Sequence, residues 1–532
     1  MPKKKKVSPK KSKKKVSPSK TKKITQVKPK KKKVSPKKSK KKVSSSKTKK
    51  SKTRRLLKSR RGRPRLTQKK TQDQPEKKNK KKYQPEILRG MKDVLPEETK
   101  IWNYVLRRAR DLAKEYSFEE IFSPILEEQA LFEKATGLTS DIVEKQMYQF
   151  TDRGGNKIVL RPELTPSIVR AYIEQGMFNL SQPVKIFYFG PAFRYERPQA
   201  GRMRQFYQFG LETVGSANPS VDAQLILFAQ VLFNLLNLKV NIQVNSLGCP
   251  VCRQPYRNKL VRYLKSHQKS LCPDCQKRLK RNPLRILDCK NEKCQEIIQQ
   301  APQLVDDICP DCRQHFVKVL EYLDETNVVY KVNPYLVRGL DYYTRTVFEF
   351  LPNREGIKKE IITSPQVEEE KKEPVKKEER EIKEEKLGAQ SALGGGGRYD
   401  NLVENLGGRP TPAAGFACGF ERIIEELKIQ RVSVPHSRPP QVFLAQIGEI
   451  ASRQALRLFE ELRQQGIRVK ENVNKTSLKA QMEMANKLGV KMTLILGHQE
   501  VLDQTIIIRN MHTGNQEIVD QEKIIKELKK RL

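Results

Sequence analysis

The sequence predicts an α+β main domain, a small C-terminal α/β domain and a disordered basic segment ahead of both. Three observations support this prediction. Residues 1–82 contain 40 of the 108 Lys and Arg residues but only two acidic ones. Residues 85–425 combine amphipathic helical periods with short alternating strands. Residues 441–532 alternate strand-like and helical stretches, as α/β domains do.

Residues 1–84 are predicted to be disordered, because like charges repel and almost no large apolar side chains are present to form a core. The stretch at residues 3–23 recurs at 30–50 with a single substitution. Residues 61–64, Arg-Gly-Arg-Pro, resemble an AT-hook, and narrow minor grooves attract arginine. The simpler interpretation is a polycation that holds any nucleic acid through its phosphates.

Charge and hydropathy limit the classes of protein that fit. The chain has a formal net charge of +48, and residues 1–82 account for 40 − 2 = +38 of it. No apolar run approaches the roughly 20 residues of a membrane span. The basic start is not followed by the apolar core of a secretory signal. We therefore expect a cytoplasmic protein that makes no membrane contact.

The main domain is expected over residues 85–425. A helix is predicted directly after Pro96, and a strongly apolar helix is predicted over 220–236. The stretch 328–351 alternates as strands do. Residues 353–388 form a low-complexity Glu/Lys insertion. The main domain should therefore be a sheet with helices, interrupted once by a solvated segment.

The C-terminal part follows a different pattern. Residues 426–440 are expected to form a linker, because their second half is rich in proline. Strand-like stretches at 441–447, 467–471 and 490–497 are separated from one another by helical stretches, and a further strand-like stretch follows at 505–511. This alternation predicts parallel strands in residues 441–532.

The stretch GPAFRYERPQAGRMRQFYQFGLE, residues 190–212, has the pattern of a two-stranded hairpin. Residues two apart in a strand share a face, so Arg194 lies with Glu196. On the second strand Phe206 lies with Glu212. The opposite face is expected to pack in the core and holds Phe193, Tyr195, Tyr207, Phe209 and Leu211.

Two interpretations of the polar face of this hairpin remain open. It could be a solvated ladder of salt bridges. It could also be the floor of a ligand site, in which Arg194 binds a phosphate and Phe206 stacks a base. The carboxylates would then hold a cation or an amine. The basic loop between the strands suits a polyanion.

The hairpin resembles motif 2 of the class II aminoacyl-tRNA synthetases. Two other stretches resemble the remaining motifs of that family. FSPILEE resembles motif 1, whose proline, here Pro124, lies at the dimer interface. GFACGFERI resembles motif 3, which carries a helical arginine, here Arg422. The resemblance implies an antiparallel-sheet catalytic domain and a homodimer.

Two further stretches resemble signatures of the histidyl-tRNA synthetases. They are LVRGLDYYTRTVFEF at residues 336–350 and GGGRYDNLV at 395–403. The resemblance covers residues 84–532 apart from the Glu/Lys insertion, and it makes 441–532 an anticodon-binding domain. It implies ATP-dependent ligation of L-histidine to tRNA(His) through a histidyl-adenylate, with AMP and pyrophosphate released.

The resemblance also implies roles for individual residues. Arginine suits phosphate because its planar fork donates two parallel hydrogen bonds. The implied catalytic residues are Arg194 and Arg338. The implied ATP contacts are Arg194, Glu196, Phe206, Arg338 and Arg422, with Mg²⁺ accompanying the nucleotide. The implied histidine contacts are Glu163, Thr165 and Gln208 for the ammonium group, and Glu212, Tyr343 and Tyr399 for the imidazole. The implied tRNA contacts are Arg197, Gln199, Arg202 and Arg204.

Eight of the nine cysteines fall in a Cys-rich insertion expected over residues 241–325. Most are spaced as Cys-x₂-Cys pairs, which let two thiolates reach one tetrahedral Zn²⁺. If the insertion leaves and rejoins the domain at neighbouring points, its outer pairs should meet. The predicted sites are therefore Cys249, Cys252, Cys309 and Cys312 in one, and Cys272, Cys275, Cys289 and Cys294 in the other. Reduced, metal-free cysteines are the alternative, and Cys418 is expected to be a small packed residue.

Two other functions are compatible with parts of the sequence. One is a synthetase-like regulatory subunit of histidine biosynthesis, a class that lacks the anticodon domain and has degenerate catalytic arginines. The other is a nucleic-acid-binding protein defined by its basic tail. Arg194, Arg338, Arg422 and residues 441–532 are all present here, which favours the ligase.

Overall fold

The computed structural model describes residues 85–137, 140–198, 202–354, 392–435, 439–474 and 477–532. The basic segment 1–84, Gln199 and nearly all of the predicted Glu/Lys insertion lie outside these ranges. Within them, no helix is both long enough and apolar enough to cross a bilayer.

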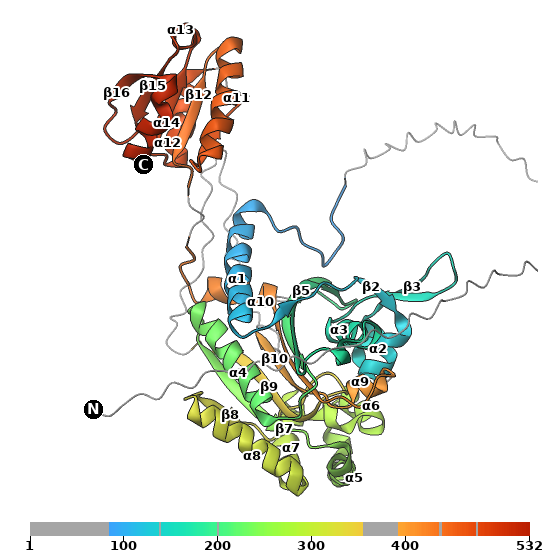
Figure 1. Cartoon of the computed structure of the whole chain (residues 1–532). Coiled ribbons are helices and arrows are strands. Elements are labelled where there is room, and N and C mark those ends of the chain that lie inside the picture. The colour runs from blue at the N-terminus through green and yellow to red at the C-terminus, as the bar shows by residue number, and fades with distance from the viewer. Residues whose placement is uncertain (1–84, 138–139, 199–201, 355–391, 436–438, 475–476) are drawn as a thin grey trace, which may run out of the picture. The chain divides into compact units, whose positions relative to one another are not determined.

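An eight-stranded sheet forms the centre of the main domain (Figure 1). Its strands are antiparallel to their neighbours, except that the outer pairs β1–β5 and β7–β8 are parallel. In spatial order they are β1 (Glu119–Glu120), β5 (Val184–Phe193), β6 (Gln205–Val214), β11 (Ala413–Gly419), β10 (Gly394–Arg398), β9 (Thr344–Pro352), β7 (Val240–Ser246) and β8 (Tyr330–Val332). The α+β class with an antiparallel sheet is thereby confirmed.

Four helices share one hydrophobic core with this sheet. They are α1 (Pro96–Glu115), α4 (Pro219–Leu235), α8 (Pro310–Glu325) and α10 (Phe420–Ile429). The two helices expected from apolar periodicity, α1 and α4, are confirmed within a residue or two. Proline at the first position of α1 has no amide that needs an intrahelical partner, and Glu97 and Glu98 complement the positive end of the helix dipole.

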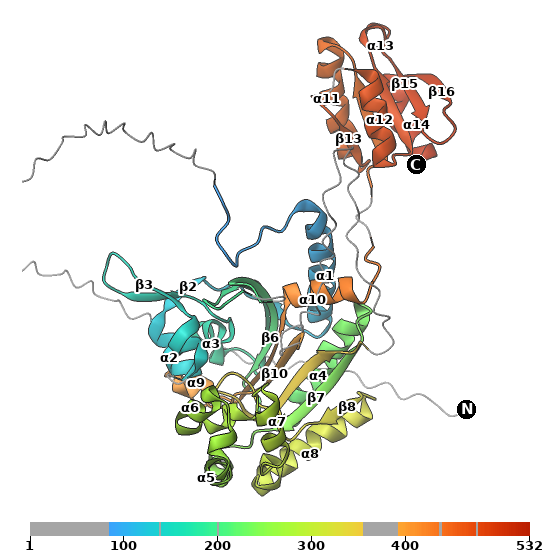
Figure 2. The ribbon, with the colours of Figure 1, turned by 180° about the vertical axis from the view of Figure 1, so that it is seen from behind.

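A second core lies under a different set of helices and includes all eight clustered cysteines of the insertion as core or packing residues. Figure 2 shows α5, α6 and α7 grouped together beside the sheet. The helices of this region are α2 (Gln129–Thr136), α3 (Thr165–Glu174), α5 (Pro250–Ser266), α6 (Pro273–Arg281), α7 (Glu292–Gln299) and the single turn α9 (Leu402–Asn405). A small antiparallel sheet accompanies them, ordered β2 (Leu126–Glu128), β4 (Lys157–Leu160) and β3 (Tyr148–Thr151).

Three details of the main domain differ from the sequence-based expectations. The stretch 328–351 is not strand throughout, because residues 333–343 form a loop between β8 and β9; we call it the signature loop. Strand β7 and helix α8 fall inside the expected insertion, yet both belong to the main core, so the inserted part is shorter. Tyr195 is 54% exposed, because β5 ends at Phe193 and the packing face ends with it.

The C-terminal domain is a separate five-stranded sheet with its own core. Its strands are, in order, β13 (Val469–Glu471), β12 (Val442–Gln446), β14 (Met492–Leu496), β15 (Thr505–Asn510) and β16 (Gln516–Asp520). Its helices are α11 (Glu449–Gln464), α12 (Leu478–Leu488), α13 (His498–Leu502) and α14 (Ile524–Arg531). The predicted parallel pairing is right for the first three strands and wrong for β15 and β16, which are antiparallel.

Candidate active site

The middle of the large sheet has room for buried polar side chains because two of its strands contribute glycine there. Gly415 on β11 faces Glu212 on β6, and a Cβ at Gly415 would collide with the Glu212 carboxylate. Gly395 on β10 lies under Arg338, whose Nη1 would be 2.7 Å from a Cβ at that position. Close approach, rather than an unusual backbone conformation, therefore requires glycine at both positions.

Glu212 lies at the centre of the first group of candidate residues and is only 1% exposed. Its carboxylate accepts hydrogen bonds from the Thr165 hydroxyl at 2.7 Å, from the Tyr188 hydroxyl at 3.1 Å and from the Tyr399 hydroxyl. Burial raises the pKa of Glu212 to about 8, although these three donors act to lower it. The site thus holds a carboxyl group that gains and loses its proton near neutral pH.

Glu163 is the second buried carboxylate of the site, 4% exposed. Its Oε2 accepts a hydrogen bond from Tyr342 at 3.0 Å, whereas its Oε1 has no partner among the described residues. Burial raises the pKa of Glu163 to about 7, and the charge of Arg194 opposes the shift. The Oε1 atom of Gln208 is likewise buried without a partner in the described chain. Because unpaired buried oxygens are costly, both atoms indicate where a donor-bearing ligand binds.

Arg338 extends from the signature loop over this group. Its guanidinium forms an ion pair with Glu349 on β9 and lies 5.7 Å from the centre of the Tyr343 ring. Burial alone would lower the pKa of Arg338, but Glu349 outweighs that effect and the pKa is raised. Its Nε is buried and has no hydrogen-bond acceptor among the residues described. Arg338 therefore stays charged and retains an unused donor.

Arg194 and Arg422 bring further positive charge to the same place. The Arg194 guanidinium lies 5.2 Å from the centre of the Phe206 ring, and its Nε donates to the Pro162 carbonyl at 3.0 Å. The Nη1 of Arg422 donates to the Ala392 carbonyl at 2.8 Å. Burial lowers the pKa of Arg422, and the charges of Arg202 and Arg194 lower it further. Cations that repel one another in this way make a site for a multiply charged anion.

The loop after β5 holds the remaining candidates. Arg202 lies 3.6 Å from the Glu196 carboxylate, and Arg204 donates to the Glu196 carbonyl at 3.2 Å. Arg204 also lies over the ring of Tyr195, 4.3 Å from its centre. Arg197 is exposed. Glu196 is therefore paired with arginine in this structure, and Gln199 lies outside the described residues.

The candidate residues thus form one connected group. Glu163 interacts electrostatically with both Arg194 and Arg338, which joins the carboxylates to the arginines. Tyr343 and Tyr399 both lie within 6 Å of Tyr342, with ring centres 4.8 and 5.7 Å away.

Comparison with known proteins identifies the family of the chain. A family model described as histidyl-tRNA synthetase matches residues 90–363, and one described as an anticodon binding domain matches 441–531. The histidine–tRNA ligase of Desulforamulus reducens is 45% identical over 424 residues, which cover 80% of this chain and 94% of that protein. The chain belongs to the histidyl-tRNA synthetase family. The histidine–tRNA ligase of Pelotomaculum thermopropionicum is 44% identical, over 80% of this chain and 92% of that protein.

A solved member of the family has the same fold. The crystal structure of apo histidyl-tRNA synthetase from S. aureus is 33% identical to the chain, with a TM-score of 0.65. The alignment of the two covers 84% of this chain and 100% of the S. aureus chain. The fold is therefore that of a class II synthetase with an anticodon-binding domain.

Sequence reasoning missed three residues of the site. Tyr342 donates to Glu163, Tyr188 donates to Glu212, and Glu349 pairs with Arg338. Tyr342 stands beside Tyr343 in the family signature, which was a usable signal. Glu349 alternates with inward-facing phenylalanines on β9, so its polar character was visible but its partner was not. Tyr188 lies before the motif 2 stretch and carried no signal.

The raised pKa of Glu212 leads to a testable dependence of stability on pH. The pKa of this carboxyl is 4.5 in the unfolded chain and is raised to about 8 by burial in the folded chain. Between these values the folded chain holds a proton that the unfolded chain has lost, so the free energy of unfolding falls as pH rises. Glu212→Gln removes this titration. The melting temperature of the variant minus that of the native chain should therefore increase by at least about 3 °C from pH 5.5 to pH 8.5.

Thermal unfolding followed by circular dichroism at several pH values measures this difference. Glu174→Gln is the matched control, because Glu174 is on the exposed side of α3 in an ion pair with Arg170. A difference that is the same at every pH would show that Glu212 is ionised throughout the range.

Proposed function

We propose that the chain joins L-histidine to tRNA(His) in two steps, through a histidyl-adenylate made from ATP. The observation that supports this best is the proximity of two types of charged group: the buried carboxylate of Glu163, which has an unpaired oxygen, lies next to a group of mutually repelling arginines. The first type suits an ammonium and an imidazole, and the second suits a triphosphate. The chain also spans 94% of the length of the Desulforamulus ligase.

In the first step, a carboxylate oxygen of histidine attacks the α-phosphorus of ATP, and the bond to pyrophosphate breaks. Negative charge builds up on the α-phosphate oxygens as this happens. Arg194 and Arg338 would neutralise it, and groups whose positions are fixed beforehand lower the barrier. Arg422 would hold the γ-phosphate and Phe206 would stack on adenine. The enzyme needs no covalent intermediate of its own.

Mg²⁺ is expected to enter with ATP and to supply further positive charge to its phosphates. The carboxylates beside the arginines are Glu196 and Glu349, and carboxylate oxygens are ligands that Mg²⁺ accepts. Both form ion pairs with arginine in this structure, so either would have to share its oxygens with the metal.

Recognition of histidine requires acceptors and donors in fixed places. Glu163 and Gln208 offer free oxygens to the ammonium group. Glu212, held by Thr165 and Tyr399, offers a carboxyl oxygen to an imidazole N–H. An amino acid of similar size without an imidazole N–H would still pair Glu163 through its ammonium group but would not supply the donor that Glu212 is placed to accept. Such sites discriminate strongly against analogues without the hydrogen-bonding atoms.

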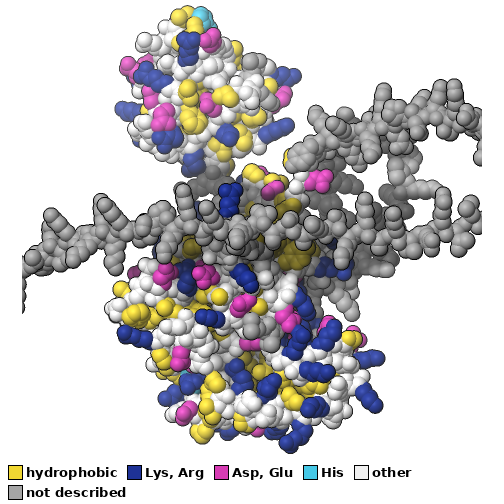
Figure 3. Space-filling model, turned by 90° about the vertical axis from the view of Figure 1, so that its right-hand side faces the viewer, with side chains coloured by type: hydrophobic (Ala, Val, Ile, Leu, Met, Phe, Trp, Pro, Cys, Tyr) yellow, Lys and Arg dark blue, Asp and Glu magenta, His cyan; other side chains and the backbone are white. Residues whose placement is uncertain are grey.

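In the second step, histidine moves from the adenylate to the terminal adenosine of the tRNA. We assign Arg197, Gln199, Arg202 and Arg204 to contacts with the acceptor end, and residues 441–531 to the anticodon. Residues 83–532 carry 68 basic and 58 acidic side chains. Figure 3 shows both kinds intermixed on one face of the larger body. The basic segment 1–84 would therefore supply most of the non-specific attraction for nucleic acid.

We also propose that two copies of the chain pair through motif 1. Phe122, Ile125 and Leu126 are 73%, 40% and 48% exposed in the single chain. Three large apolar side chains in five residues are typical of a surface that another protein covers. Self-pairing buries such a patch on both copies at once. We place the activity in the cytoplasm, and we take the two cysteine clusters as candidate zinc sites.

Pyrophosphate exchange tests the proposal directly. Of the common amino acids, only histidine should support the exchange of labelled pyrophosphate into ATP by the purified chain. A chain that lacks residues 1–82 should keep at least about half of that rate, because every residue assigned to the first step lies beyond 160. Loss of exchange on truncation would instead favour a function located in the basic tail. Absence of exchange with any amino acid would favour the regulatory-subunit alternative.

A further inference from the structure

The eight cysteines of the insertion form two compact clusters. The outer cluster contains Cys249, Cys252, Cys309 and Cys312, and the inner cluster contains Cys272, Cys275, Cys289 and Cys294. Within each cluster all four Sγ atoms lie within 4.8 Å of one another. This is the nested pairing that the sequence predicts. None of these cysteines forms a disulfide.

The distances between sulfur atoms fit a shared metal ion. Four thiolates around Zn²⁺ at about 2.3 Å lie about 3.8 Å apart if the arrangement is tetrahedral. The Sγ atom of Cys249 is 3.5 Å from that of Cys252 and 4.0 Å from that of Cys309. In the inner cluster, Cys272 and Cys289 are 3.9 Å apart. The S–S bond of a disulfide is about 2.0 Å long, so these sulfur atoms are too far apart to be joined in disulfides.

The local backbone suits thiolate ligands. Cys249, Cys272 and Cys309 each cap the N-terminus of a helix, and each is followed by proline. Amide groups point at the sulfurs: Cys249 N–H donates to Cys252 Sγ at 3.2 Å, and Cys272 N–H donates to Cys294 Sγ at 3.3 Å. Hydrogen bonds of this kind orient metal ligands and stabilise their charge.

A sharp turn before Cys249 is part of the same arrangement. Gly248 has φ +59°, a left-handed conformation that favours glycine. A Cβ there would lie 2.6 Å from Cys252 Sγ. Glycine is therefore required both for the turn and for the room that the sulfur occupies.

We propose that each cluster binds one structural Zn²⁺ and that the two ions together hold the signature loop in its working position. Four protein thiolates leave no open position on the metal, so neither ion takes part in the chemistry. The inference rests on the proposed function for the role of the signature loop, which carries Arg338 and Tyr343. The link from metal to loop runs through three sets of contacts.

The first contacts come from the residues beside the outer cluster. Arg253 follows Cys252 directly and is close enough to interact electrostatically with Cys249, Cys252 and Cys312. Its Nη2 donates to the Tyr343 carbonyl. The residue before Cys249 is hydrogen-bonded to β9, the strand that follows the signature loop, because Arg345 N–H donates to the Gly248 carbonyl at 2.9 Å. A −2 charged Zn(Cys)₄ centre would hold Arg253 against the end of the loop.

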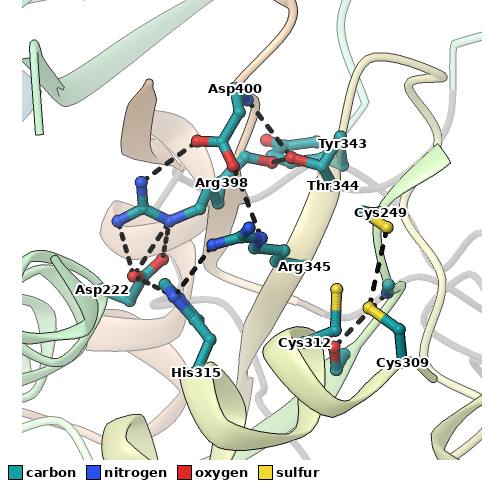
Figure 4. Close-up of polar contacts among 12 residues, drawn as sticks. Asp222, Cys249, Cys309, Cys312, His315, Tyr343, Thr344, Arg345, Arg398 and Asp400 are labelled. Atoms are coloured by element: carbon teal, nitrogen blue, oxygen red, sulfur yellow. Dashed lines mark hydrogen bonds and ion pairs between the residues drawn. The ribbon is translucent and has the colours of Figure 1, made fainter. Parts of the chain in front are cut away.

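The second contacts run along helix α8, which starts at the outer cluster. Figure 4 shows Cys309 and Cys312 on one side and His315 directed toward Asp222. His315 Nε2 lies 3.1 Å from Asp222, and Arg345 donates to its Nδ1 at 3.4 Å. An arginine can only donate, so Nδ1 accepts this hydrogen bond, which leaves Nε2–H to donate to Asp222.

Asp222 connects this helix to the second signature. It accepts a hydrogen bond at 2.7 Å from Arg398, a fully buried residue that directly precedes Tyr399. Burial alone would raise the pKa of Asp222, but Arg398 and His315 outweigh it and lower the pKa. Fixing the start of α8 thus also fixes Arg398, the last residue of β10, which directly precedes Tyr399.

The third contacts come from inside the inner cluster. Asn282 and Arg285 lie between its two cysteine pairs, in the segment that a metal ion would close into a ring. Asn282 donates to Asp341 of the signature loop at 2.8 Å. Arg285 Nη1 lies so near Gly339 of the loop that a Cβ there would be 2.7 Å away.

Metal analysis of the purified native chain tests the two sites. About two zinc ions per chain are expected. Cys309→Ser and Cys289→Ser should each retain about one, and Cys418→Ser, which changes the buried thiol of β11, should retain both. Cobalt exchange gives a second measurement that does not require stable variants: tetrahedral Co(Cys)₄ absorbs in the visible. Less than about 0.2 zinc per chain, or iron in its place, would overturn the assignment.

The link to the loop needs a separate variant with intact cysteines. Arg253→Met should keep two zinc ions, raise the KM for histidine by about tenfold and leave the KM for ATP unchanged. Arg253→Lys should recover part of the loss. An unchanged KM for histidine in Arg253→Met would refute the coupling. A chain that contains no zinc but exchanges pyrophosphate at a normal rate would contradict only this inference. A chain that contains both zinc ions but shows no exchange with any amino acid would contradict the proposed function.

Discussion

Arg338→Ala should slow histidine-dependent pyrophosphate exchange by a factor of about 10³ or more, equivalent to about 4 kcal/mol of lost transition-state stabilisation. Two effects add. The α-phosphate loses a fixed positive group, and Glu349 loses the cation that it pairs with in the folded chain. The remaining carboxylate would then repel the phosphates of ATP. Exchange rates at saturating ATP and histidine measure the loss.

Arg110→Ala is the control for this variant. Arg110 forms a partly exposed ion pair with Glu120 at 2.6 Å, outside the site, and such pairs contribute little to stability. Both variants should have the far-ultraviolet circular dichroism of the native chain. Exchange by Arg338→Ala within tenfold of the native rate would remove Arg338 from the catalytic residues.

Glu163→Gln should raise the KM for histidine by about 10²-fold while the KM for ATP stays the same. The Oε1 atom of Glu163 has no partner in the described part of the chain, and the proposed site gives it the ammonium group of the substrate. Removing one member of a buried charge pair typically costs about 2–5 kcal/mol. Tyr342 would keep a hydrogen-bond acceptor in the glutamine, so the fold should survive.

Glu174→Gln serves as the control, because that carboxylate is exposed and paired with Arg170. The measurement is the exchange rate against histidine concentration at several pH values. Because the pKa of Glu163 is about 7, native affinity for histidine should rise between pH 6 and pH 8, and the variant should show less of this rise. A variant that loses affinity for ATP instead would place Glu163 on the nucleotide side of the site.

Much of the site could be predicted because the residues that bind phosphate and histidine lie in short stretches with strong local patterns. Arg194, Phe206 and Glu212 fall on or beside one hairpin, and alternation along a strand assigns them to faces without any knowledge of the tertiary fold. The cysteine clusters could be predicted for a similar reason. Their spacing limits which sulfurs can meet once the insertion is taken to leave and return at neighbouring points.

What could not be predicted depends on partners far apart in the sequence. Arg398 and Asp222 are 176 residues apart, and neither carries a local pattern that names the other. The signature loop lies in a stretch, 328–351, that alternates as a strand would, but within the described residues it pairs with no strand. Tyr195 follows the same alternation, yet it lies past the end of β5, where a face no longer exists. Pattern alone does not show where a strand stops.

Strands β9 and β10 are hydrogen-bonded neighbours, with Leu393 N–H donating to the Phe350 carbonyl at 2.8 Å. The long Glu/Lys stretch therefore departs from and rejoins the sheet at a single hairpin end. A turn of a few residues could replace it, and an unrelated domain could be grafted there, without altering the spacing of either strand. That hairpin end offers an internal attachment point for a fluorescent or affinity module when both chain termini must remain native.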